Sequence, residues 1–397
     1  MKPINQFAAV VVLAALAAAV PALAQQSRMY REGNAWVEEV TGTIADARQL
    51  KVQTDVGSVQ VQGGTQNDIQ YVIKKRSYTD SEEDARRSFE HFKITATRRG
   101  DMAMFEGNSE GRSHKFNADF NFTVPRDLSA VKIETEGGGV NVRNISGAVS
   151  TQTGGGAISL DQLGGPATAE TGGGAINVGT TWNDLHLETG GGSINVTSVK
   201  GKLVASTGGG SISIGSAGFV SAETGGGSID IRQCNGDVKA ETGGGSISVS
   251  DVANRATMET GGGSIRLSGA KGPVHAETGG GSIELWKLMQ GAKATTGAGT
   301  ITAEFVGNNG SGASMLETST GDVIVYLSPD VHVTVHATIE TAMGHKIRTD
   351  FPELKVRSEG EGYGPHTVYA DGSLNGGGPE LKIVTNLGNI EFRKAGK

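Results

Sequence analysis

The sequence is poor in the residues that usually stabilise exported or globular proteins. It has a single cysteine, Cys234, in 397 residues, so no disulfide bond can form within the chain. Cys234 aligns with aliphatic residues of neighbouring repeats, such as Val199 and Val252, and we expect it to be a small buried core residue. Aromatic residues make up only 5% of the chain, too few for a wide globular core. Any core must therefore be narrow and repetitive.

Long apolar segments are also scarce, and the one that is present lies at the start. Lys2, an apolar run over residues 7–20 and small residues before Gln25 form the pattern of a secretory signal peptide. We expect cleavage before Gln25 and export to the periplasm, the cell surface or the exterior. The alternative is an uncleaved membrane anchor, for which the run is short. No later run is long enough to cross a bilayer, so we expect no transmembrane segment in the mature chain.

The charge balance and the motifs that are missing argue against further functions. The formal net charge is -7, and a mildly acidic chain is not expected to bind nucleic acid. The chain contains neither H-E-x-x-H nor G-x-S-x-G, and we predict no catalytic residue, no bound cofactor and no metal site. His186 and His275 fall in the same outward column of the repeats, in coils too far apart to share a ligand. We predict surface roles for both.

Glycine is present in large excess, with 62 residues in a regular repeat. The stretch A-E-T-G-G-G-S-I occurs three times. Successive triplets are 17 or 18 residues apart, which is too short for a helix pair or a propeller blade. The repeat predicts an all-β, single-chain parallel β-solenoid (β-helix) with one coil of about 18 residues per repeat. Triple glycines begin at residues 137, 154, 172, 190, 208, 225, 243, 261 and 279, and a G-A-G variant begins at 297.

Apolar residues within each repeat indicate two strands per coil. In one repeat, Ile247 and Val249 are followed by Val252, and then by Ala256 and Met258. Apolar residues at every second position indicate a β-strand, because alternate side chains of a strand lie on the same face of the sheet. The two pairs predict two strands that face each other across a thin core, with Val252 closing the side. A hexapeptide β-helix is the alternative, but it would place aliphatic residues at every sixth position.

The glycine triplets are predicted to be the corners at which each coil reverses. A corner stacked on another corner has little room beyond the backbone, and a tight reversal often needs the positive φ that glycine adopts freely. On this interpretation, replacing Gly244 by valine should destabilise the corner. A phosphate-binding loop is the other interpretation of a glycine-rich stretch, but its motif occurs once and precedes a helix, whereas these triplets recur before strands.

Two polar columns accompany the corners. A threonine before each triplet is predicted to point inward and to hydrogen-bond the backbone of the turns. In most repeats the preceding residue is an outward glutamate, and stacked carboxylates would repel unless they extend into solvent or bind a cation. The calcium-binding solenoid motif needs an aspartate that these repeats lack, so we expect solvated side chains. The candidates for surface contact in this column are Glu223, Glu241, Glu259 and Glu277.

The flanking regions depart from the repeat. Residues 51–61 resemble one degenerate coil, and a short helix capped by Asp80 or Ser81 is expected to cover the open N-terminal end of the rod. The chain is thus divided into a signal peptide (1–24), an N-terminal capping region with the degenerate coil and short helix (25–135), the regular T-G-G-G solenoid (136–305), and C-terminal degenerate coils with a cap (306–397).

A segment rich in glycine, tyrosine and histidine, residues 359–371, provides the remaining candidates for a specific contact. These are Tyr363, His366 and Tyr369. A simple surface loop is the alternative interpretation of this segment.

Three stretches carry a resemblance to a known family: F-T-V-P-R-D-L-S-A-V-K-I-E-T-E-G-G-G-V-N-V (122–142), the repeated E-T-G-G-G-S-I, and the closing L-N-G-G-G-P-E-L-K-I-V-T-N-L-G-N-I-E-F-R-K (374–394). Together they resemble the bacterial putative adhesin family, DUF4097, over nearly the whole mature chain. The resemblance implies a β-solenoid at or near the cell envelope and brings no catalytic residues. Some relatives have a membrane anchor, which this chain replaces with the pattern of a cleavable signal.

Three functions are compatible with these features. The first is a non-catalytic adhesin or surface-binding module, whose repetitive polar ladders bind a glycan or an envelope protein. Outward serine and asparagine residues, such as Ser193 and Asn195, would form a flat polar wall for it. The second is a periplasmic scaffold in envelope maintenance or stress response. The third and most remote is a polysaccharide-acting β-helix enzyme, which would need clustered carboxylates and a basic partner in a cleft.

Overall fold

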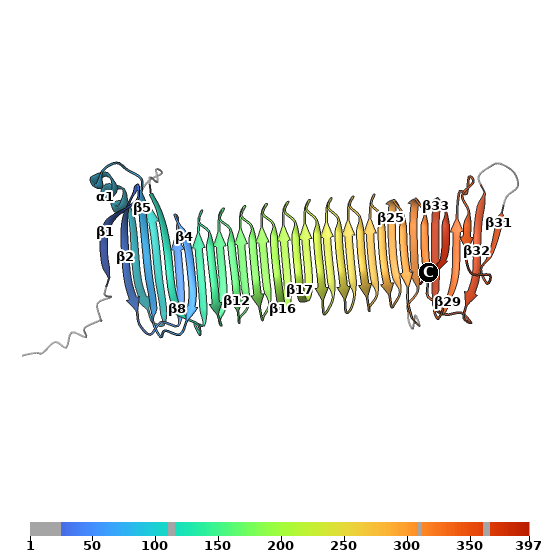
Figure 1. Cartoon of the computed structure of the whole chain (residues 1–397), viewed down its shortest axis with the longest axis horizontal. Helices are drawn as coiled ribbons and strands as arrows, with labels where there is room; N and C mark the ends of the chain where they lie inside the picture. The colour runs from blue at the N-terminus through green and yellow to red at the C-terminus, as the bar shows by residue number, and fades with distance from the viewer. Residues whose placement is uncertain (1–24, 110–115, 308–311, 360–365, 397) are drawn as a thin grey trace, which may run out of the picture.

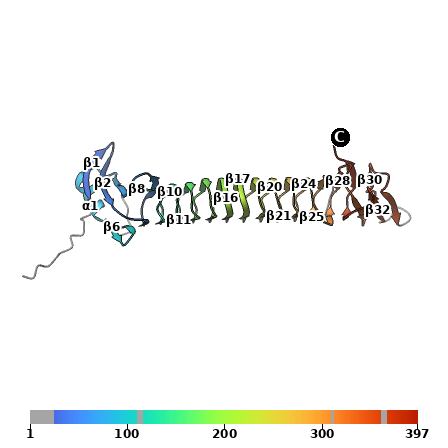
Figure 2. The ribbon, with the colours of Figure 1, turned by 90° about the horizontal axis from the view of Figure 1, so that it is seen from below.

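The computed structural model describes residues 25–109, 116–307, 312–359 and 366–396. The expected signal peptide, residues 308–311 and Tyr363 lie outside these ranges. Over the described residues, the chain forms a straight rod of two facing β-sheets, with one helix at its N-terminal end (Figures 1 and 2). The predicted all-β parallel solenoid is confirmed.

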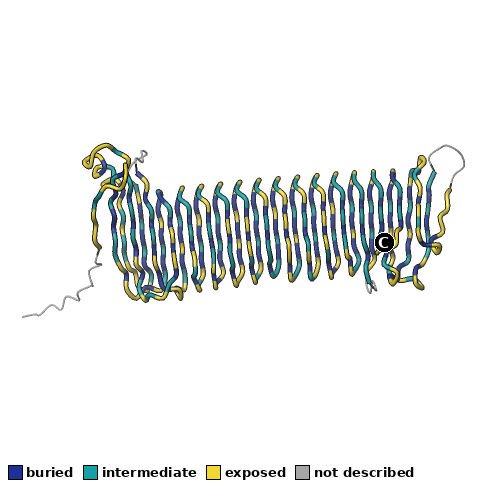
Figure 3. Tube along the Cα trace, in the orientation of Figure 1, coloured by how far each residue is buried: buried dark blue, intermediate teal, exposed yellow. Residues whose placement is uncertain are grey.

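Each regular coil contributes one strand to each sheet, as the apolar spacing predicted. In the coil of β20 (Ile247–Val252) and β21 (Ala256–Thr260), inward residues are buried and the alternating outward ones are partly exposed. Figure 3 shows the same alternation along the rod. Cys234 is buried in the core as expected, and burial raises the pKa of its thiol. The hexapeptide alternative is therefore excluded.

We call the sheet built from the strands that follow the glycine corners the first sheet, and the sheet that precedes the corners the second sheet. Two long strands, β16 (Ile194–Thr207) and β17 (Ile212–Thr224), run through both sheets. The other regular strands of the first sheet are β10 (Val140–Ile145), β12 (Ile158–Leu163), β14 (Ile176–Thr181), β18 (Ile229–Cys234), β20, β22 (Ile265–Ala270), β24 (Ile283–Leu288), β26 (Ile301–Phe305) and β28 (Val323–Leu327). Those of the second sheet are β9 (Ala130–Thr135), β11 (Ala148–Thr153), β13 (Ala167–Thr171), β15 (Leu185–Thr189), β19 (Val238–Thr242), β21, β23 (Val274–Thr278), β25 (Ala292–Ala298) and β27 (Ser314–Thr320).

The coils stack in register, so equivalent residues lie above one another. Ile229 pairs with Ile247, and Ile247 pairs with Ile265 in the next coil. Because the register is kept from coil to coil, every sequence position becomes a column that runs along the rod. The core is correspondingly thin, with large aliphatic residues on the first sheet and mostly small ones, such as Ala240 and Ala276, on the second.

Backbone stacking explains the first and third glycine of each triplet. A Cβ atom on Gly243 would lie 2.3 Å from the carbonyl oxygen of Gly225, and one on Gly245 would lie 2.0 Å from that of Gly227. By contrast, a Cβ on the middle residue, Gly244, would meet nothing within 4 Å. Both distances are far below van der Waals contact, so only glycine fits at the first and third positions.

Two expectations about these corners were wrong. None of the triplet glycines of the regular coils, residues 137–281, has φ in the left-handed range, so positive φ is not the reason for the repeat. Gly244 was also the wrong position at which to test the corner, because a side chain added there would extend into open space. The constraint is the close approach of one corner backbone to the next rather than the conformation of the turn itself.

The inward threonine column is confirmed as the polar partner of the corners. The Thr242 hydroxyl donates to the carbonyl oxygen of Gly227 in the previous coil (2.8 Å) and accepts from the amide of Gly245 in its own corner (3.2 Å). It thus joins two successive turns. Buried threonines occupy this column in the regular coils at positions 171, 189, 207, 224, 242, 260 and 278.

The N-terminal region contains the expected degenerate coil and an insertion that the repeat did not predict. Residues 49–64 form β3 (Gln49–Thr54) and β4 (Ser58–Gly64), which pair with β9 and β10. The chain before β3 and the chain between β4 and β9 lie outside the regular coils and form mainly antiparallel strands. These strands extend both sheets beyond the first coil, and they are β1 (Gln26–Glu32), β2 (Ala35–Ile44), β5 (Ile69–Ser77), β6 (Phe92–Arg99), β7 (Met102–Ser109) and β8 (Phe116–Pro125).

The predicted helix is present as α1 (Glu82–Glu90), and Ser81 is its N-cap. The Ser81 hydroxyl accepts a hydrogen bond from the Asp84 amide, as the sequence indicated. Ala85 and Phe89 are buried on its inner face, whereas Phe92 lies beyond the helix at the start of β6. The helix packs beside β2, β5 and β6 at one corner of the rod (Figure 1), and the antiparallel strands form the rest of that end.

The C-terminal end repeats the corner in weaker form, as expected. Gly321 stacks on Gly299, and Gly388 stacks on Gly321, although residues 331–374 intervene in the sequence. The pairs β27–β33 and β28–β34 continue the two sheets in parallel. The remaining strands of this end are β29 (Val333–Ile339), β30 (Ile347–Thr349), β31 (Lys355–Glu359), β32 (Thr367–Leu374), β33 (Glu380–Leu387) and β34 (Ile390–Lys394).

Alanine substitutions should separate the glycines of one triplet. We expect Gly245→Ala to reduce the free energy of unfolding by about 1–3 kcal/mol, because its methyl group would overlap the Gly227 carbonyl. Gly244→Ala is the matched control and should melt like the wild type. Thermal melts followed by circular dichroism would measure both, and equal melting temperatures for the two variants would contradict the stacking explanation.

Candidate functional site

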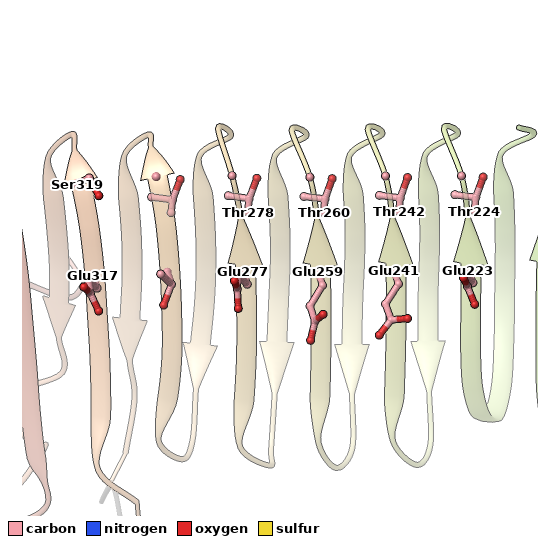
Figure 4. A pocket seen from close by; sticks show the side chains of 17 residues that line it. Glu223, Thr224, Glu241, Thr242, Glu259, Thr260, Glu277, Thr278, Glu317 and Ser319 are labelled. Carbon is pink, nitrogen blue, oxygen red and sulfur yellow. The ribbon is translucent and has the colours of Figure 1, made fainter. Parts of the chain in front are cut away.

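The outward glutamates form a continuous ladder on the second sheet, as predicted. Glu223 pairs with Glu241, Glu241 with Glu259, and Glu259 with Glu277 on adjacent strands. Figure 4 shows these carboxylates in a row below the threonines and the glycine corners. A shallow groove follows the row from Glu223 to Glu317 and is lined by the glutamates and the edges of the corners. We call these four glutamates and this groove the Glu ladder.

A second outward column on the same sheet places basic side chains beside the ladder. Lys239 lies 2.7 Å from Glu241, and this hydrogen bond, with the charges of Glu241, Glu259 and Glu223, raises the pKa of the lysine. His275 lies 3.9 Å from Glu259 and 3.7 Å from Glu277. The continuous row of carboxylates is thus flanked by occasional basic groups of the neighbouring column.

The ladder carboxylates lie largely in solvent. The exposed fraction of the side chain is 30% for Glu241, 46% for Glu259 and 58% for Glu277. Among the described residues, no group of three or more histidine, cysteine, aspartate or glutamate side chains is arranged to hold a metal ion. Such exposure allows the carboxylates to be screened by water and salt, which reduces the repulsion between neighbours.

The outer face of the first sheet carries a different ladder, made of asparagine and serine. Asn177 pairs with Asn195, and Asn195 with Ser213. The amide of Asn195 donates to the side-chain oxygen of Asn177 (3.1 Å). This is the flat polar wall that the sequence predicted, and its groups repeat at the strand spacing of about 4.8 Å.

The two histidines share a column of the second sheet. His186 lies on β15 and His275 on β23, with β16, β17, β19 and β21 between them. Four intervening strands keep the two imidazoles too far apart to bind one ligand, as expected.

The C-terminal candidates are only partly described. His366 lies just before β32, where its carbonyl accepts from the Ala342 amide (2.9 Å), and Tyr369 lies on β32 between Thr338 and Arg357. The Glu ladder and Tyr369 are on the same sheet but at different places along the rod (Figure 1). Next to Tyr369, Asp371 accepts from Arg357 and contacts His336, both at 2.9 Å.

A cluster that sequence reasoning missed lies on the outer face of the first sheet. The rings of Trp286 and Tyr326 are 5.7 Å apart, and the Arg393 guanidinium lies 5.9 Å from the centre of the Tyr326 ring. A signal was available, because Trp286 occupies the outward position at which the two preceding repeats have Ser250 and Ser268. Alignment of the outward positions would have identified it.

Among the described residues, no helix is long and apolar enough to span a membrane. Neither the models of protein families nor the curated proteins include a match to this chain.

Several solved structures are similar over most of their length. A putative cell adhesion protein from Clostridium sporogenes shares 8% identity at a TM-score of 0.16, and the match covers 93% of this chain and 98% of that one. A putative adhesin from Bacteroides fragilis shares 11% identity at a TM-score of 0.25, with 90% and 96% covered. A putative adhesin from Parabacteroides distasonis shares 12% identity at a TM-score of 0.29, with 76% and 95% covered. At these scores the likeness carries no argument about function.

Asp371 should make the C-terminal end sensitive to acid. The hydrogen bond with His336 holds the pKa of Asp371 below its usual value of 3.8, with a further contribution from Arg357. A depressed folded-state pKa stabilises the fold at pH values above the unfolded pKa, and this stabilisation is lost as the pH falls through the folded pKa. We therefore expect Asp371→Asn to melt below the wild type at neutral pH.

The difference between the two proteins should disappear in acid, below the folded pKa of Asp371. Thermal melts from neutral pH to below pH 3.8 would show this convergence. Asp127→Asn is a useful control, because Asp127 pairs with an exposed arginine at the other end of the rod. A constant difference between wild type and Asp371→Asn at every pH would contradict the ion-pair explanation.

Proposed function

We propose that this chain is a non-catalytic, exported β-solenoid that acts as an adhesin or surface-binding module. In this proposal its polar ladders bind a glycan or a protein of the cell envelope. The single observation that carries the proposal is the register, which repeats the same polar group at successive coils on both faces. Such an array fits a partner that is itself linear or repetitive.

A row of identical polar groups favours binding, because after the first contact every further contact forms between molecules that are already bound to each other. A single exposed carboxylate or amide contributes little to affinity. When several identical groups bind successive units of one partner, each further contact is effectively intramolecular, and the overall affinity rises by orders of magnitude. The straight rod holds these groups at fixed spacing, so little conformational entropy is lost when the partner binds.

The geometry gives less support to an enzyme. The Glu ladder groove is open to solvent, and its carboxylates stand one strand apart in a row. General acid and base catalysis usually requires two carboxyl groups in different environments on either side of an enclosed substrate. A row of equivalent, exposed carboxylates does not create that difference.

The ladders can be tested with two variants of residues 25–397. One replaces Glu223, Glu241, Glu259 and Glu277 by glutamine, and the other replaces Asn177, Asn195, Ser213 and Ser248 on the opposite face by alanine. We expect one of them to bind isolated cell envelopes at least about tenfold more weakly than the wild type in a sedimentation assay, because multivalent contacts are lost together. Equal binding by all three proteins would contradict a role for the ladders.

Location distinguishes the adhesin from a periplasmic scaffold. We expect added protease to degrade the protein in intact cells, because an adhesin must be exposed at the outer surface. A known periplasmic protein is the control and should be degraded only after the outer envelope is permeabilised. Protection of this protein until permeabilisation would favour an envelope scaffold over an adhesin.

A further inference from the structure

The outer face of the first sheet changes character towards its C-terminal end. Over most of the rod this face carries serine, threonine, asparagine and glycine with scattered charged residues, such as Asp161, Arg232 and Asp251, and no aromatic residue. On the strands β24, β26, β28 and β34, the outward positions instead include Trp286, Tyr326 and Arg393. Both aromatic rings are partly exposed on a flat surface rather than packed in the core. We call Trp286, Tyr326 and Arg393 the aromatic platform.

The two rings come together across an intervening strand. β24 and β28 are separated by β26, so their backbones are about 9.6 Å apart at normal strand spacing. The ring centres are nevertheless 5.7 Å apart, with an angle of 38° between the planes. The two side chains therefore lean towards each other over β26.

The residue between the two rings is turned aside. Glu304 pairs with Tyr326, and its carboxylate accepts a hydrogen bond from the Lys287 amide at 3.2 Å. This contact directs the Glu304 carboxylate towards the backbone of Lys287 on β24. The space above β26 is thus left to the rings of Trp286 and Tyr326, which form one apolar surface.

The third member of the platform is held in place by its neighbours. The Arg393 Nη1 group donates to the Tyr326 hydroxyl at 3.2 Å, and Nε donates to Glu391 at 3.0 Å. Glu391 also accepts from Arg348 at 3.1 Å. These bonds fix the orientation of the Arg393 guanidinium before any ligand binds.

The polar groups around the platform are nearly balanced in charge. Arg266, Lys287, Arg348 and Arg393 provide four positive charges, and three glutamates provide three negative ones. Arg266 and Arg348 are ion-paired but mostly exposed, with 62% and 66% of their side chains accessible, so they retain N–H groups that face water. The rim therefore offers hydrogen-bond donors and acceptors with little net charge. The glutamates are Glu284, Glu304 and Glu391.

We propose that the aromatic platform binds the pyranose rings of an uncharged polysaccharide that lies along the rod. One face of a pyranose presents C–H groups of slightly positive character, which pack on the negative face of an aromatic ring. Its equatorial hydroxyls both donate and accept hydrogen bonds, and the nearly neutral rim of basic side chains and glutamates matches them. A flat surface is sufficient for such a ligand, and no enclosed pocket is needed.

The length of the platform suits a polymer. From β24 to β34 it crosses three strand spacings, or about 14 Å, which is longer than one sugar ring. This inference rests on the proposed function of a binding rod, and it narrows the partner to a neutral glycan.

Affinity electrophoresis of residues 25–397 in native gels would test the proposal. The probes are hydroxyethyl cellulose, a β-1,4-glucan, and dextran, an α-1,6-glucan, each compared with a gel that contains no polysaccharide. We expect at least one of them to retard the wild type. Trp286→Ala and Tyr326→Ala should each weaken that binding about tenfold, because each removes one stacking surface. Trp286→Phe and Tyr326→Phe, which keep a ring, should retain most of it.

The matched control is Trp182→Ala, because Trp182 is also exposed but lies in a turn far from the platform. It should migrate like the wild type in every gel. Thermal melts of all variants would verify folding, and Tyr326→Ser is a second variant if Trp286→Ala melts early. Wild-type mobility that is unchanged by both polysaccharides would overturn the proposal, as would retardation that survives both alanine substitutions.

The two proposals fail in different ways. If the platform variants abolish retardation while the ladder variants still bind envelopes like the wild type, the platform is supported and the ladders are not needed. If a ladder variant loses envelope binding while both alanine variants at the platform are still retarded in the gels, the proposed function stands and the neutral-glycan platform is wrong.

Discussion

Direct stacking of one backbone corner on the next is the constraint on which the rest of this structure depends. Each coil turns at a point where the carbonyl of the preceding corner occupies the place of a side chain, as Gly227 does above Gly245. No residue larger than glycine fits there. The cost of ordering so much glycine is offset by ladder hydrogen bonds to the coils on both sides, and by the threonine hydroxyl that joins successive corners.

Two consequences follow from the fixed corners. The register cannot slip, because a shift of one residue would place a side chain against the corner and would turn the core residues outward. Outward positions therefore become straight columns, and a small difference between repeats becomes a local feature of the surface. Lys239 beside the Glu ladder and Trp286 on the opposite sheet are examples.

The two ends of the rod are built differently from the regular coils. A solenoid coil leaves unpaired backbone groups on its outer edge, which would invite further strand pairing. Here the N-terminal end is extended by antiparallel strands and by a helix at one corner, and the fold widens enough to hold aromatic residues. Phe105 packs between Tyr71 and Phe122, with ring centres 4.8 and 4.7 Å away. This region holds a wide core of the kind that the regular coils lack.

The sequence by itself determined the repeating part of the molecule. Spacing by two specified the strands, and the strict interval between glycines specified one coil per repeat, so the inward threonines and the Glu ladder could be placed without coordinates. These features depend only on contacts between equivalent residues of adjacent coils.

The tertiary structure alone decided the rest. It showed that close backbone approach, and not positive φ, selects glycine, and it brought together β4 and β10 across a long insertion. It also revealed the aromatic platform, in which the rings of Trp286 and Tyr326 meet across β26 while the Glu304 carboxylate accepts from a backbone amide. Such contacts depend on how side chains lean in space, which a one-dimensional repeat does not specify.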